Sequence, residues 1–100
     1  MWLAVNTMNT TVSDNIIDNI GVNNAGGGSS TGIQIYTNAG AGSAPSANKI
    51  FRNKISNLFS TGLNSSVTGI GLGGTTSGTV ISQNTINNLV NTRSGTAVGY

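Results

Sequence analysis

The charged side chains are the residues of this sequence whose chemistry could be catalytic, and there are only six of them. Three cations lie close together, namely Lys49, Arg52 and Lys54. Such a cluster could contact an acidic ligand, or remove the proton next to a carboxylate in an elimination reaction. The same residues are typical of a solvated strand face, because lysine is a common guard against edge pairing. All three are therefore candidates for substrate binding, and the alternative is that they only form a solvated, charged strand face.

Asp14 and Asp18 are the only acidic side chains. A glycosidase needs two carboxylates on either side of a cleft, and a calcium site needs roughly six to eight oxygen ligands. Alignment of the repeats described below places Asp14 in one column with Arg52, which predicts an exposed ion pair instead. The sequence therefore predicts no catalytic residue, no metal site and no cofactor, and it favours a role other than catalysis.

Several function classes are excluded by composition. Histidine and cysteine are absent, which removes the commonest general base, thiol chemistry and disulfides. No G-x-S-x-G elbow is present, so a serine hydrolase is not expected. The net charge of +2 lacks a clustered basic face, so no nucleic acid partner is expected. No apolar run is long enough to predict a membrane span.

Two repeated phrases organise the chain and must position these side chains. The phrase I-x-x-N-x-I-x-N-L occurs at 12–20, 50–58 and 81–89. The phrase T-G-I-x-I alternates with it at 31–35 and 68–72, with shorter relatives at 3–5 and 96–100. A unit of about 30 residues with Gly/Ser-rich insertions is typical of a solenoid. Residues 1–100 are therefore predicted to form a single repeat segment.

The periodicity inside each unit is two, which predicts β-strands with one face inward. Ile33 and Ile35 occupy alternate positions, as do Ile70 and Leu72. The nine-residue phrase is interpreted as a strand, a bend at its first asparagine and a second strand, because asparagine tolerates the left-handed conformation. A helical repeat and a leucine-rich repeat are the alternatives. Asparagine and β-branched residues disfavour helix, and the L-x-x-L-x-L run is missing.

Stacking of the repeats predicts columns of equivalent residues. The four apolar columns are Ile17, Ile55 and Ile86; Ile20, Leu58 and Leu89; Val12, Ile50 and Ile81; and Leu3, Ile33, Ile70 and Val98. The two asparagine columns are Asn15, Asn53 and Asn84; and Asn19, Asn57 and Asn88. Stacked asparagines can donate to carbonyl groups of the next unit, which satisfies polar groups that would be costly to bury unpaired.

These phrases and their Gly/Ser loops resemble the right-handed parallel β-helix repeat of pectate lyases, alginate-modifying enzymes and many secreted bacterial surface proteins. The resemblance implies an all-β solenoid of about three coils, a fragment of a longer helix, with an asparagine ladder. It implies a structural or adhesive segment of a secreted or cell-surface protein that could bind carbohydrate. The alternative is a fragment of a polysaccharide lyase, a glycoside hydrolase or another carbohydrate-active enzyme. The expected partners are adjacent coils of a longer chain, a second copy of this chain, or a polysaccharide.

Overall fold

The computed structural model describes residues 1–3, 7–37, 47–74, 78–92 and 95–98, and every regular element in them is a β-strand. The strands are β1 (Trp2–Leu3), β2 (Thr11–Ser13), β3 (Ile16–Asp18), β4 (Gly21–Val22), β5 (Ser30–Thr37), β6 (Lys49–Phe51), β7 (Lys54–Ser60), β8 (Ser65–Gly74), β9 (Val80–Ser82), β10 (Thr85–Asn91) and β11 (Gly95–Val98). Residues 38–46 and 75–77 of the Gly/Ser-rich insertions, parts of the phrases at 3–5 and 96–100, and Arg93 lie outside the described residues.

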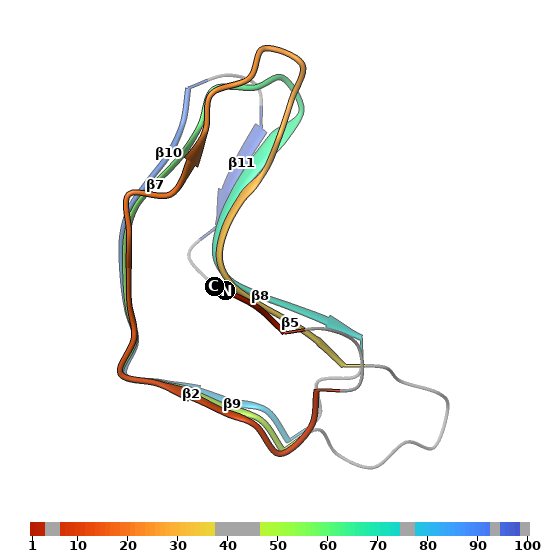
Figure 1. Cartoon of the computed structure of the whole chain (residues 1–100), viewed down its shortest axis with the longest axis vertical. Helices are drawn as coiled ribbons and strands as arrows, with labels where there is room; N and C mark the ends of the chain where they lie inside the picture. Colours follow the sequence, from red (N-terminus) through yellow and green to blue (C-terminus); the bar gives the residue numbers. More distant parts are fainter. Residues whose placement is uncertain (4–6, 38–46, 75–77, 93–94, 99–100) are drawn as a thin grey trace.

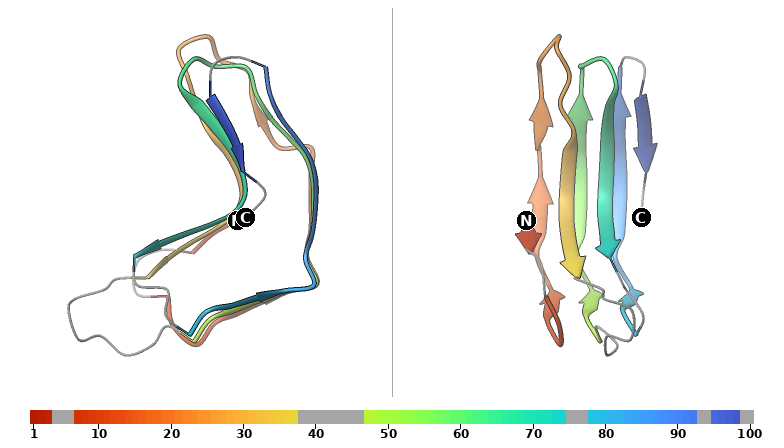
Figure 2. Two further views of the ribbon diagram at one scale, coloured as in Figure 1. Left: turned by 180° about the vertical axis from the view of Figure 1, so that it is seen from behind. Right: turned by 90° about the vertical axis from the view of Figure 1, so that its right-hand side faces the viewer.

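The strands form three sheets, with orders β1-β5-β8-β11, β2-β6-β9 and β3-β7-β10, and β4 pairs with β7 beside β3. All of these pairings are parallel. The chain visits the three sheets in the same order on each pass, so that equivalent strands superimpose in Figure 1 and stand side by side in Figure 2. The prediction of an all-β chain with parallel strands is confirmed.

The core is built from the apolar columns that the repeat phrases predict. Ile17 pairs in register with Ile55, and Ile55 with Ile86. Ile55 is fully buried, whereas Ile86 on the last pass is only partly covered. The column of Val12, Ile50 and Ile81 is also in register. One pass cannot bury its own apolar face, and the middle pass is buried because it has a neighbour on each side.

The predicted fourth column is wrong at both of its ends. Ile33 pairs with Ile70 as expected, but Leu3 pairs with Ile35, and Val98 pairs with Thr68. Each end is therefore displaced by two residues. A two-residue shift keeps every side chain on the same face of the sheet, so alternation of apolar residues cannot distinguish the two registers.

The sharp bend in the nine-residue phrase lies one residue earlier than predicted. The left-handed residues are Asp14, Arg52 and Gln83, with φ of 58°, 52° and 55°, and each precedes a ladder asparagine. The asparagine closes the bend with its side chain: Asn53 Nδ2 donates to the Phe51 carbonyl two residues back, at 3.2 Å. The strand–bend–strand interpretation is thus confirmed, with the strained conformation placed on the neighbouring residue.

The glycine in the T-G-I phrase is explained by packing. A Cβ atom added to Gly32 would lie 2.7 Å from Ile55 Cγ2 and 2.7 Å from the carbonyl oxygen of Gly69. Both glycines are buried in neighbouring strands of one sheet. Any larger residue at Gly32 would therefore push the central isoleucine out of its column.

Candidate functional site

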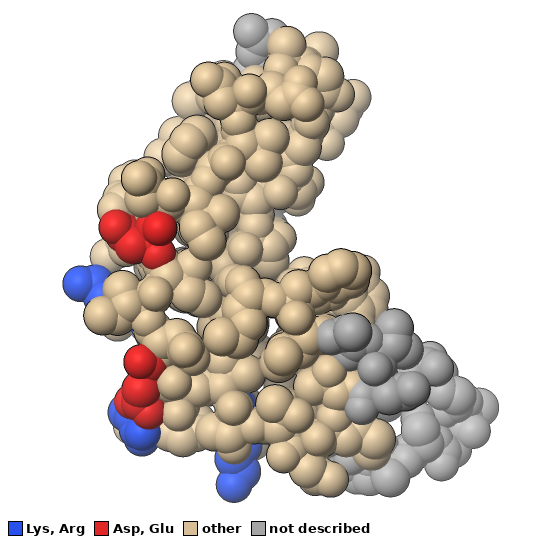
Figure 3. All heavy atoms as spheres, viewed as in Figure 1, with Lys and Arg blue, Asp and Glu red and all other residues tan. Residues whose placement is uncertain are grey.

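The three candidate basic residues lie on one pass of the chain, around the bend between β6 and β7. Lys49 begins β6 and Lys54 begins β7, and both side chains are exposed. Ile50 and Asn53, which alternate with the basic residues, are buried. All three cations therefore project away from the core, along the edge that Figure 3 shows in blue and red.

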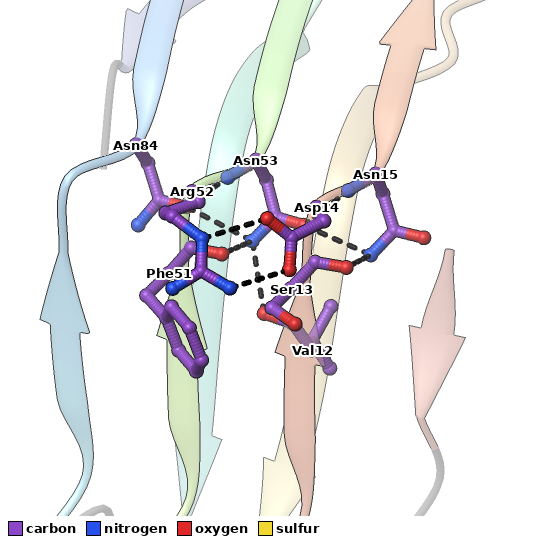
Figure 4. A network of polar contacts seen from close by, with 8 residues as sticks. All are labelled: Val12, Ser13, Asp14, Asn15, Phe51, Arg52, Asn53 and Asn84. Carbon is purple, nitrogen blue, oxygen red and sulfur yellow. Dashed lines mark hydrogen bonds and ion pairs between the residues drawn. The ribbon is translucent and has the colours of Figure 1, made fainter.

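Arg52 is engaged by an acid of the preceding pass. Its Nε and a terminal nitrogen donate to the two carboxylate oxygens of Asp14 at 2.7 and 2.8 Å. The guanidinium also lies over the ring of Phe51, 4.4 Å from its centroid. Figure 4 shows this pair beside the asparagine column. The predicted ion pair is confirmed, and it occupies the fork of donors that would otherwise meet an acidic substrate.

Asp18 is held in a second set of contacts on the same surface. Ser56 Oγ and Asn57 Nδ2 donate to its Oδ1 at 2.5 and 2.8 Å. The hydrogen bond from Ser56 is the main reason that the pKa of Asp18 is lowered, and the nearby charge of Lys54 adds to the effect. A general acid needs a raised pKa, so this carboxyl is suited to holding neighbouring passes together.

The two carboxyl groups predict how stability depends on pH. Their pKa values are lowered from 3.8 in the folded chain, chiefly by hydrogen bonds from Arg52 to Asp14 and from Ser56 to Asp18. A lowered folded-state pKa gives stability that is present above the unfolded value and is lost as the pH falls through the folded one. Thermal melts should thus be flat near neutral pH and fall below about pH 4. The double variant Asp14→Asn and Asp18→Asn should lose most of that acid dependence; an unchanged slope would contradict this account.

The first asparagine column forms a continuous ladder across the three passes (Figure 4). The backbone N–H and Nδ2 of Asn15 both donate to Asn53 Oδ1, at 3.1 and 2.9 Å. Asn53 repeats these two bonds to Asn84 Oδ1, at 3.0 and 2.9 Å. In the reverse direction, Asn53 Nδ2 donates to the carbonyl of Val12, and Asn84 Nδ2 to that of Ile50. The predicted ladder is confirmed, and its asparagine-to-asparagine bonds all run in one direction along the stack.

The second asparagine column is confirmed for its last two members. Asn88 Nδ2 donates to Asn57 Oδ1, while Asn57 Nδ2 donates to Asp18 in place of Asn19. Asn19, Asn57 and Asn88 all have left-handed φ, between 52° and 56°. Short polar side chains are the ones that tolerate this conformation, so the column also fixes a bend within each pass.

A further buried asparagine, Asn48, was not predicted from the sequence. Asn48 is fully buried; its Oδ1 accepts the N–H of Thr10 at 3.0 Å, and its Nδ2 donates to the carbonyl of Thr7 at 2.9 Å. The available signal was its position two residues before the repeat phrase. The other passes carry threonine there, which hid the column.

A pocket of about 420 Å³ opens beside the N-terminal strand. It is lined by Met1, Trp2, Ile20, Val22, Ser29, Ser30, Thr31, Gln34 and Tyr36. The side chains of Trp2 and Tyr36 are 74% and 45% exposed. The register of β1 on β5 places Trp2 opposite Gln34, which brings the two aromatic residues together. Exposed aromatic rings with nearby amide and hydroxyl groups are suited to the apolar face and the hydroxyls of a sugar.

Other signals of function are sparse in the described residues. They contain no group of three or more His, Cys, Asp or Glu side chains that could hold a metal. They contain no helix with the length and apolar character needed to cross a membrane. No family model, curated protein or solved structure matches the chain. Functional inference therefore depends on the geometry described above.

Proposed function

We propose that the chain is a segment of a right-handed parallel β-helix of about three coils, with a structural or adhesive role in a secreted or cell-surface protein. The observation that carries this proposal is the asparagine ladder with its parallel strands, because both repeat in register from pass to pass. A pectate-lyase-like scaffold uses the same device, as the resemblance of the repeat phrases implies.

The use made of the polar groups supports a structural role. Asp14, Asp18 and Arg52, which are half of the charged side chains, bind neighbouring passes to each other. Two buried serines do the same: Ser30 Oγ donates to the Phe59 carbonyl, and Ser60 Oγ to that of Gly28. Side chains that already hold the body together have little freedom to take part in acid–base chemistry.

The pocket beside Trp2 is the feature that favours carbohydrate as a ligand. Its volume is within the usual range of small-molecule sites, roughly 300–1,000 Å³. It offers an exposed indole, a phenol and the Gln34 amide, and it contains none of the charged side chains. A neutral or weakly acidic sugar at a cell surface fits these groups better than a highly charged ligand.

We expect weak binding of plant or bacterial polysaccharide to the purified chain, and Trp2→Ala should weaken it by about tenfold through the loss of ring stacking. Saturation-transfer NMR or a glycan array measures this. Leu63→Ala is the matched control, because Leu63 is also exposed and does not line the pocket. Equal binding by the Trp2 and Leu63 variants would refute the pocket as the site.

The same preparation tests the enzyme alternative. The chain is incubated with pectate and alginate, with and without calcium, and the ultraviolet absorbance of unsaturated product is followed. We expect no product. Product that disappears when Lys49, Arg52 and Lys54 are replaced by alanine would contradict the structural role, and it would identify a fragment of a polysaccharide lyase instead.

A further inference from the structure

The two end faces of the stack carry open strand edges. Among the described strands, those of the first pass (β2 and β3) and of the last pass (β9 and β10) each have a strand neighbour on one side only. At the last pass the ends of apolar columns are uncovered: Ile81 is 40% exposed, whereas Ile50 in the same column is fully buried. Exposed edges and apolar column ends of this kind mark a surface that another chain can extend.

We propose that these two faces bind each other, so that a second copy of this chain stacks head to tail on the first. The proposal rests on the β-helical fold of the proposed function and adds the partner that its open faces fit. In this arrangement the first pass of one copy takes the place of a next pass on the other. The columns that end on β9 and β10 then continue onto β2 and β3 of the second copy.

The asparagine ladder supplies a donor at one face and an acceptor at the other. Within the chain, each ladder residue donates its backbone N–H to the Oδ1 of the next pass. Asn84 is the last member, and its N–H has no acceptor among the described residues. Asn15 is the first member, and no described group donates to its Oδ1. Head-to-tail stacking brings these two groups together at the spacing that the ladder already uses.

The charged columns are also complementary across the junction. Asp14 is followed by Arg52 on the middle pass and by the exposed Gln83 on the last. Asp18 is followed in register by Ser56 and then by the exposed Asn87. A stacked copy would therefore place two amide groups against two carboxylates. Both contacts pair a donor with an anion, and neither places like charges together.

The apolar columns and the size of the faces agree with this arrangement. Ile81 and Ile86 would pack against Val12 and Ile17 of the second copy, as their counterparts do inside the chain. Val12 and Ile17 are already buried, so the apolar area covered at the junction comes chiefly from the last pass. The faces lie within an outline of 40 × 28 Å, which leaves room for the roughly 800 Å² per partner of a standard interface. The contact joins two different faces, so it does not close on itself and continues into longer assemblies.

Two variants block one face each. Gln83→Asp with Asn87→Asp places carboxylates on the last pass, opposite Asp14 and Asp18 of the next copy. Thr11→Pro removes an amide from the open edge of β2: Lys49 N–H donates to the Thr10 carbonyl, so the next amide points away from the middle pass. Leu63→Asp with Asn64→Asp is the control, since it makes the same change in charge at exposed residues between β7 and β8.

Analytical ultracentrifugation measures the mass of each protein over a range of concentrations. We expect the wild type and the control to grow beyond dimers, and each blocked variant to stay monomeric with at least tenfold weaker association. An equimolar mixture of the two blocked variants should form a 1:1 dimer and nothing larger. One variant keeps an intact first-pass face, and the other keeps an intact last-pass face.

Three results would overturn the proposal. They are a wild type that stays monomeric at every soluble concentration, a blocked variant that dimerises alone, and a mixture that stays monomeric although both variants are folded. Far-UV circular dichroism separates these from failure of the proposed function. A folded, β-rich monomer would contradict only the proposed head-to-tail contact. A chain without β structure would contradict the proposed β-helical fold itself.

Discussion

Replacing Ile55 with alanine is expected to lower the free energy of unfolding by about 2–5 kcal/mol. Ile55 is fully buried, lies in register between Ile17 and Ile86, and contacts the backbone around Gly32. The smaller side chain would leave a cavity that neighbours fixed by strand pairing cannot fill. Since small domains unfold at roughly 5–15 kcal/mol, the loss would be a large part of the total.

Urea denaturation followed by far-UV circular dichroism measures this loss. Ile16→Ala is the matched control. Ile16 directly precedes Ile17 on β3, and its side chain is 78% exposed. An exposed substitution of this kind changes stability by only about 0.5 kcal/mol. If the Ile55 and Ile16 variants unfold at the same urea concentration, Ile55 does not lie in the core.

Replacing Asn53 with alanine should cost about 2–4 kcal/mol, because it leaves several partners unpaired in the interior. Asn53 Oδ1 accepts two bonds from Asn15, and its Nδ2 donates to Asn84 and to the carbonyl of Val12. The residue is 1% exposed, so water cannot replace these partners.

Asn87→Ala is the control for this variant, because Asn87 is exposed on β10 and should change stability little. Asn64→Ala should fall between the two, at about 1 kcal/mol, because Asn64 has a left-handed φ of 52° that alanine adopts at a cost. Chemical denaturation compares all three. Equal midpoints for the Asn53 and Asn87 variants would contradict a stabilising ladder.

The strands and the core could be predicted from the sequence because each position of the nine-residue phrase has an equivalent in two other copies. Ile55 is aligned with Ile17 and Ile86, and a shared apolar type at one position of a strand indicates a buried column. The ends of the chain offer no such comparison. Leu3 fits the inward face equally well opposite Ile33 or Ile35, and the structure pairs it with Ile35.

The site was less predictable because its parts meet only through the register between passes. Trp2 and Tyr36 belong to different passes, and nothing in either phrase brings them to one pocket. The pairing of Asp14 with Arg52 could be predicted because both precede a ladder asparagine. The role of Asn48 could not, since threonine occupies that position in the other passes and conceals the column.

The number of residues that separates paired strands in the sequence also determines how the chain must fold. The ladder bonds join residues that are 38 and 31 positions apart, and no described strand pairs with the one next to it in sequence. The described strands thus form no hairpin from which ordering could start. Two whole passes must meet before any strand pairing forms, and closing loops of that length is an entropic barrier. The transition state is accordingly non-local, and such topologies fold in about milliseconds to seconds rather than microseconds.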